Sequence, residues 1–111
     1  MKFADLEVFS QMPFLFWVKD KDSRYVWGNA KINKEAKQPV AGKLDADMWW
    51  KDDAPMLIEH DKQVLATGEP IFLQEHVLKS DEGDLTLNVC KWLGELDGEP
   101  HCFGISFVID K

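Results

Sequence analysis

The hydrophobic and polar positions of the chain predict two blocks of strands separated by a helical block. Near the N-terminus, two runs of aromatic and β-branched residues flank a polar turn, which is typical of a hairpin. Three further runs of this kind occur near the C-terminus, and Asp97-Gly98 between the last two is a hairpin signal. The predicted strands are 14–19, 24–28, 71–78, 84–93 and 101–109.

Helix signals fill the segment between the two strand blocks. Asn29 is a suitable N-cap for a short helix over 30–37. Asp53 is a suitable N-cap for a longer helix over 54–66, and Gly68 is its expected end. The predicted inward stripe of this longer helix is Leu57, Asp61, Val64 and Leu65.

The first residues form a separate amphipathic segment. Phe3 and Leu6 stand at helical spacing within 2–11, and a helix this short has to pack on another element to be stable. The strand and helix order favours one α+β domain with an antiparallel sheet. We expect residues 1–12 to be a flanking helix and residues 13–111 to be the domain core.

Composition and charge narrow the function. The net charge is −7, from 13 basic and 20 acidic residues, and no basic cluster is present. Phosphate binding needs a basic stripe, so we expect no nucleic-acid partner and no direct membrane contact. The first residues lack the apolar run of a signal peptide, which predicts a cytoplasmic location. Cys90 and Cys102 have no metal-site spacing and are expected to be reduced and buried, with a cross-strand disulfide as the alternative.

Four local patterns, in order, resemble the PAS (Per-Arnt-Sim) sensory domain family over nearly the whole chain. They are the hairpin MPFLFWVKDKDSRYVWGN, the loop VAGKLDADMWW, the helix exit HDKQVLATGEP, and the ending FGISFVIDK, where Asp110 matches the aspartate of the family's Asp-Ile-Thr element. The resemblance implies a PAS-like five-stranded antiparallel sheet with helices packed on one face. It also implies that the chain is a fragment of a larger signalling protein such as a sensor kinase, a cyclic-dinucleotide enzyme or a chemoreceptor.

The same resemblance implies a function in sensing. A PAS module binds a small molecule or cofactor and relays the signal through dimer packing to a covalently linked output domain. The alternative is a ligand-free PAS module for dimerisation or protein interaction. An enzyme is not expected, because no nucleophile with a base, no paired carboxylates in a cleft and no glycine-rich phosphate loop are visible.

The residues that would line a cavity are predicted from strand alternation and from register with flavin-binding PAS domains. The small and polar sets of the last two strands would face the helices, and Thr86, Asn88 and Ser106 would orient a ligand by hydrogen bonds. The alternative is that Trp49 and Trp50 fill this space. The predicted cavity-lining residues are His60, Val64, Thr86, Asn88, Cys90, Gly104 and Ser106.

His60 carries the most specific cofactor hypothesis. Haem-based oxygen sensors of the PAS family hold iron through a histidine on this helix, and His60 is followed by Asp61. The following strand lacks the arginine of such sensors, so a half-buried histidine is the alternative. Flavin–thiol chemistry is not expected, because residues 44–53 contain no cysteine. The cofactor therefore stays unknown, haem and flavin have no direct support, and no metal site is predicted.

The chain has five tryptophans and seven phenylalanines in 111 residues, and this aromatic content predicts a protein interface. Leu15 and Trp17 share one face of their strand, and with Phe3 and Leu6 of the first helix they would form an outward apolar patch. A second copy of the chain is the natural cover for such a patch, so we expect a homodimer. The alternative is that the first helix covers its own sheet.

Overall fold

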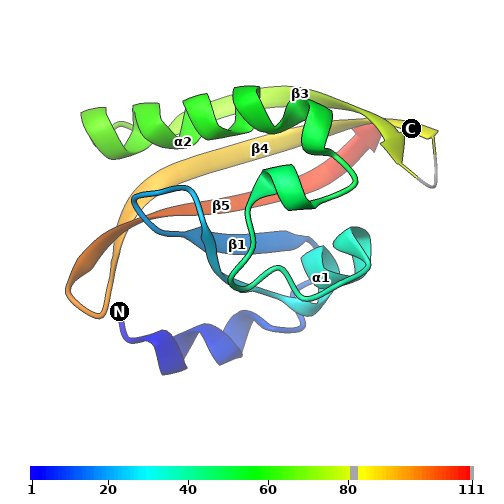
Figure 1. Ribbon diagram of the computed structural model, residues 1–111. Helices are drawn as coiled ribbons and strands as arrows, with labels where there is room; N and C mark the ends of the chain where they lie inside the picture. Colours follow the sequence, from blue (N-terminus) through cyan, green and yellow to red (C-terminus); the bar gives the residue numbers. More distant parts are fainter. Residues whose placement is uncertain (81–82, 111) are drawn as a thin grey trace.

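The computed structural model describes residues 1–80 and 83–110, with side chains described for 1–76 and 86–109. Five antiparallel strands form one sheet in the order β2-β1-β5-β4-β3. The first and last strands of the chain are therefore neighbours near the centre of the sheet (Figure 1). The strands are β1 (Leu15–Lys19), β2 (Tyr25–Gly28), β3 (Ile71–Ser80), β4 (Gly83–Leu96) and β5 (Glu99–Asp110). The helical elements are η1 (Phe3–Phe9), α1 (Ala30–Ala36), η2 (Asp45–Asp47), η3 (Lys51–Asp53) and α2 (Ala54–Thr67).

This architecture confirms the predicted fold class and all five predicted strands. The β4–β5 hairpin turns at Asp97 and Gly98, whose φ angles of 51° and 83° are both positive, as the tight hairpin turn requires. The segment between the predicted strands 71–78 and 84–93 includes residues 81 and 82, which lie outside the described residues.

Side-chain hydrogen bonds fix where α1 begins. The Asn29 Oδ1 atom accepts from the backbone N–H of Ile32 at 3.1 Å and from that of Phe16 at 3.2 Å. The same residue therefore caps α1, as predicted, and ties it to β1. At the start of α2, Asp53 occupies the N-cap position without a side-chain cap hydrogen bond, because η3 runs directly into the helix.

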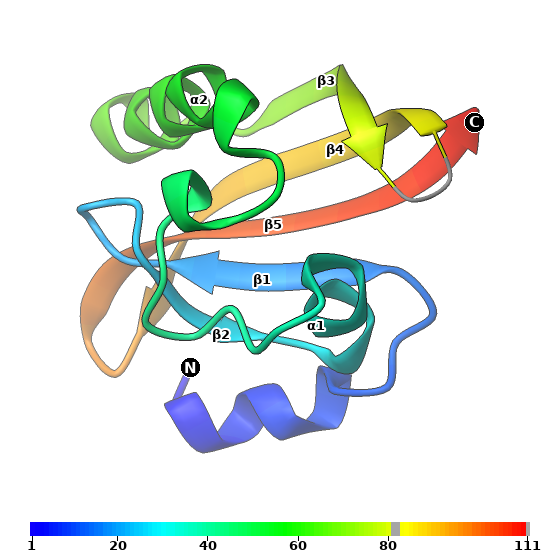
Figure 2. The same cartoon turned by 45° about the vertical axis from the view of Figure 1, so that its right-hand side comes forward.

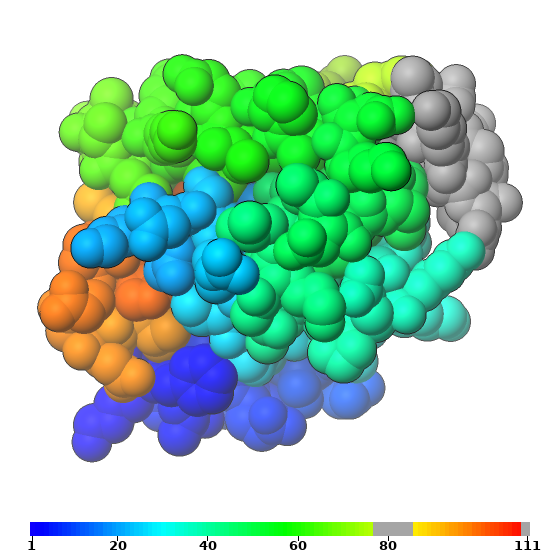
Figure 3. Space-filling model, viewed as in Figure 1, coloured from blue at the N-terminus to red at the C-terminus, as the bar shows by residue number. Residues whose placement is uncertain are grey.

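Different elements cover the two faces of the sheet. The cyan and green segments, which include α1, η2, η3 and α2, form a continuous layer over one face (Figure 3). The opposite face packs against η1, which lies at the lower edge of the molecule in Figure 2. None of the described helices is long and apolar enough to cross a membrane.

The predicted outward patch is wrong for three of its four residues. Leu15 and Trp17 are 8% and 6% exposed and pack in the core beneath the helical layer. Leu6 is fully buried on the other face, so η1 covers its own sheet, and Phe3 alone stays exposed. The sequence pattern was apolar on both faces of β1, and it could not say which face a second element already covers. A homodimer stays a prediction, but these three buried residues do not form its surface.

Candidate functional site

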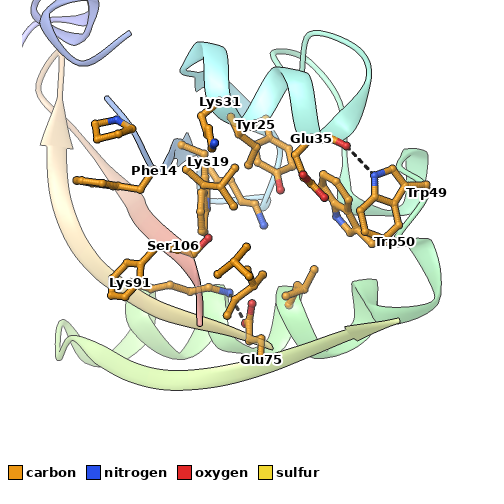
Figure 4. Close-up of a pocket in the computed structure, with 18 residues that line it drawn as sticks. Phe14, Lys19, Tyr25, Lys31, Glu35, Trp49, Trp50, Glu75, Lys91 and Ser106 are labelled. Carbon is orange, nitrogen blue, oxygen red and sulfur yellow. Dashed lines mark hydrogen bonds and ion pairs between the residues drawn. The ribbon is translucent and has the colours of Figure 1, made fainter. Parts of the chain in front are cut away.

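A cavity of about 370 Å³ lies between the sheet and the helical layer. Residues from all five strands and both α-helices line it, and Figure 4 shows their side chains converging on it. Much of the lining is aromatic, from Phe14, Trp17, Tyr25, Trp49, Trp50 and Phe107. The two tryptophans before α2 thus form part of the wall and leave the space open.

A cluster of buried charged side chains borders this cavity. We call Lys19, Asp45, Asp61, Glu75 and Lys91 the buried charge cluster; each is at most 5% exposed. At one end of it, Lys19 Nζ donates to Asp45 Oδ2 at 2.5 Å and to Asp61 Oδ2 at 2.8 Å. The other carboxylate oxygen of Asp45, Oδ1, accepts from two aromatic donors: the Tyr25 hydroxyl at 2.7 Å and Trp50 Nε1 at 2.9 Å.

The other end of the buried charge cluster centres on Lys91. Its Nζ atom lies 3.4 Å from Asp61 Oδ1 and 3.4 Å from Glu75 Oε2. Glu75 Oε2 in turn lies 3.3 Å from His60 Nδ1, near the surface. These contacts join β1, β3 and β4 to α2, so the cluster connects the cavity to the packing of α2 on the sheet.

Burial and pairing act in opposite directions on the cluster's pKa values. Burial alone would lower the pKa of Lys19, but the carboxylates of Asp45 and Asp61 outweigh it and raise that pKa above its ordinary value. Burial would likewise raise the pKa of Asp45, and Lys19 outweighs it, so that pKa is lowered. Burial and the charge of Asp45 together raise the pKa of Tyr25 well above its usual range. The Lys19–Asp45 pair is therefore held ionised beside a neutral phenol.

The formal charges in the cluster do not balance. Two lysines face three carboxylates, which leaves one net negative charge when His60 is neutral. The Cys102 thiol lies 3.7 Å from Asp61 Oδ1, and burial, with the Asp61 charge, raises its pKa to about 12. Both cysteines are free, as predicted, but only Cys102 is buried; the prediction that Cys90 is buried is wrong, because its side chain is half-buried.

Several buried polar atoms at the cavity make no hydrogen bond. Within the described part of the chain, Trp17 Nε1, Lys91 Nζ and Ser106 Oγ are buried without a hydrogen bond, and all three residues line the cavity. The two 3.4 Å contacts of Lys91 are ion pairs too long for good hydrogen bonds. A buried polar atom without a partner costs about 1–3 kcal/mol, so three beside one cavity require an explanation.

The predicted cavity residues of β5 lie on the expected face. Ser106 lines the cavity, and Gly104 faces the helical layer beneath the Trp17 indole. A Cβ atom on Gly104 would lie 2.4 Å from Trp17 Cε2, so only glycine fits there. Of the helix residues, Val64 is fully buried but does not line the cavity. Binding by these residues stays a prediction.

His60 does not line the cavity either. Its ring lies at the rim of the buried charge cluster, 3.3 Å from Glu75, and its side chain is 23% exposed. A haem in the cavity would need this nitrogen ligand directed inward, so the residues present do not fit haem. Within the described residues, no group of three or more histidine, cysteine, aspartate or glutamate side chains is placed to hold a metal ion.

The predicted inward face of β4 is wrong. Leu87 and Lys91 line the cavity and Val89 packs in the core beneath the helices. Asn88 and Cys90 lie on the opposite face, in a shallow groove lined also by Phe72 and Phe107. The prediction placed small polar residues toward the helices, whereas burial of apolar side chains decides a strand's orientation.

Thr86 belongs to the same wrongly assigned face of β4. Its hydroxyl lies 3.1 Å from the exposed ring of His76 on β3 and is not part of the cavity lining.

Sequence reasoning missed most of the buried charge cluster. It placed Asp61 on the inward stripe of α2, and the structure places Asp61 fully buried there. The available signal was two-residue spacing along the strands. Lys19 follows Trp17 and Lys91 follows Val89 at this spacing, so each lysine shares a face with apolar residues of its strand. A lysine in that phase, with an aspartate in the inward stripe of a helix, predicts a buried ion pair.

The family follows from comparison of the sequence with family models. The model of the PAS fold matches residues 9–108. The chain belongs to the PAS family. No curated protein matches the sequence.

Solved structures of PAS domains share the fold at low sequence identity. VqmA of Vibrio cholerae, in complex with ligand and DNA, has a TM-score of 0.82 and 16% identity, over 97% of this chain and 51% of that chain. The PAS domain of BvgS from Bordetella pertussis has a TM-score of 0.78 and 17% identity, over 97% of this chain and 85% of that chain. The PAS domain of nitrogen regulation protein NR(II) from Vibrio parahaemolyticus has a TM-score of 0.70 and 11% identity, over 95% of this chain and 97% of that chain. This PAS chain spans about half the length of the VqmA chains it matches.

The VqmA structures correct one expectation from the charge of the chain. We expected no nucleic-acid partner, but a protein with this PAS fold occurs in a complex with DNA. The exclusion was wrong because the net charge of one PAS domain describes only its own surface. It says nothing of other domains in a protein that contains it.

Proposed function

We propose that this PAS domain is the sensory module of a signal-transduction protein and that it binds a small molecule in the cavity above the sheet. PAS domains are generally sensory rather than catalytic, and neighbours in the fold come from sensor proteins such as BvgS and NR(II). The observation that carries the proposal is the set of three buried polar atoms at the cavity that make no hydrogen bond, on Trp17, Lys91 and Ser106. A bound molecule would supply the hydrogen bonds that they lack.

The buried charge cluster supports a relay from this cavity. A ligand that engages Lys91 competes with the contacts of Lys91 to Asp61 on α2 and to Glu75 on β3. Binding would therefore change how tightly α2 packs on the sheet, and this is the movement that we propose to be read by the rest of the signalling protein.

A native mass spectrum of freshly purified protein tests the proposal first. We expect a retained small molecule, or binding of one from a metabolite extract. Ser106→Leu fills the cavity and should abolish binding, whereas Asn88→Leu on the opposite face of the sheet should preserve it. If neither the purified protein nor the extract gives a complex, the ligand-free interaction module is the better description.

A further inference from the structure

The unpartnered atoms at the cavity are hydrogen-bond donors. Lys91 Nζ and Trp17 Nε1 can only donate, and the Ser106 hydroxyl can donate or accept. From these atoms we infer that the ligand is a small, planar, electrically neutral molecule that presents hydrogen-bond acceptors, such as a ring carbonyl or ring nitrogen, to the sheet. The inference rests on the proposed function and names the chemical class of its ligand.

The sheet register places the three donors on neighbouring strands. Trp17 of β1 pairs with Gly104 of β5, and Gly104 pairs with Lys91 of β4, so Trp17 and Lys91 flank the glycine in one row. Ser106 is two residues further along β5 on the same face, about 7 Å from that row. Figure 4 shows the Lys91 and Ser106 side chains on the same side of the cavity. The three donors therefore face the cavity from the same side of the sheet.

The buried charge cluster argues for a neutral ligand. It already carries one net negative charge beside the cavity, and an anion would add a second in a buried site. A cationic ligand would face the ammonium groups of Lys19 and Lys91, which also line the cavity, and would leave the free donors without acceptors. A neutral acceptor can hydrogen-bond to these donors without adding a further charge to the buried charge cluster.

The walls of the cavity argue for a flat and small ligand. Trp17, Tyr25, Trp49 and Trp50 present aromatic faces and edges to the space. A volume of about 370 Å³ stands at the lower end of the range of about 300–1,000 Å³ for small-molecule sites. Both features favour a molecule of one or two rings.

A charge-matched fragment panel tests the inference. One- and two-ring heteroaromatic compounds are each used as the carboxamide, the carboxylate and the aminomethyl derivative, with nicotinamide, nicotinate and 3-(aminomethyl)pyridine as the first set. Binding is followed by the tryptophan indole signals in ¹H–¹⁵N spectra of the protein. We expect the carboxamides to bind at least tenfold more tightly than their charged counterparts.

Two variants assign the effect to the donors. Ser106→Ala and Lys91→Met should each weaken carboxamide binding several-fold, and Asn88→Ala on the opposite face should leave it unchanged. Ser106→Ala keeps the test valid if Lys91→Met fails to fold. If the carboxylates or amines bind as tightly as the carboxamides, the inference is wrong while the sensory function stands. If no member of the panel shifts the indole signals, the inference is wrong, and the native mass spectrum decides separately whether the proposed function stands.

Discussion

The two faces of the sheet are built from different chemistry. The face under η1 is apolar, and Phe16 and Phe103 lie there with their ring centroids 6.4 Å apart. The face under α1 and α2 holds the buried charge cluster and an open cavity. Packing of the first kind is enough for stability, because buried apolar side chains need no hydrogen-bond or charge partner. The second face retains buried charges and donors without hydrogen bonds at a cost, which supports the binding that we propose.

The largest effect is expected from Lys19→Met, which removes a charge from the cavity face. Asp45 and Asp61 would stay buried without their shared cation, so unfolding free energy should fall by about 3–5 kcal/mol. Urea unfolding measures the loss. Lys31→Met is the matched control, because Lys31 lines the same cavity but is exposed, and it should change stability by less than about 0.5 kcal/mol. Equal effects of the two variants would contradict the role of the cluster.

A comparable but smaller loss is expected on the apolar face. Leu6 of η1 is fully buried against the sheet, so Leu6→Ala should cost about 2–4 kcal/mol through lost burial and the cavity left behind. Val8 in the same element is 82% exposed, and Val8→Ala should be nearly neutral. Loss of η1 packing should leave fragment binding in the cavity intact. If binding falls with Leu6→Ala in a protein that is still folded, the two faces are not independent.

Acid should weaken the cavity face specifically. Lys19 lowers the pKa of Asp45 in the folded protein, so its stabilising contribution is fully present above the ordinary aspartate pKa of about 3.9. That contribution is lost as the pH falls below this value and through the lowered folded pKa. Unfolding free energy measured by urea between pH 6 and pH 2.5 should therefore decline less steeply in Asp45→Asn than in the unmodified protein. Identical slopes would show that Asp45 is not ionised in the folded state.

The smallest effect concerns reactivity rather than stability. A pKa of about 12 gives the Cys102 thiol roughly a thousandfold smaller thiolate fraction at pH 8 than an ordinary cysteine. Iodoacetamide at pH 8, followed by peptide mass mapping, should therefore modify the half-buried Cys90 and leave Cys102 unmodified until the protein unfolds. Equal labelling of both thiols would show that the cavity face opens readily.

The elements of the fold were predictable because their signals are local. Alternating aromatic and β-branched residues gave the five strands, Asn29 marked the start of α1 and Gly68 the end of α2. The candidate site was predicted only in part. Gly104 and Ser106 lie on the expected face of β5, but the corresponding face of β4 was assigned the wrong way round.

The sequence alone determined the order of strands and helices, the family and the cap residues, since each depends on neighbours within a few positions. Tertiary structure decided which face of each strand is inside and which charges meet there. Lys19, Asp45, Asp61 and Lys91 are far apart along the chain, and only sheet register and the packing of α2 bring them together. The partner that stabilises a buried charge is a non-local property, so the cavity and its free donors emerge only from the assembled fold.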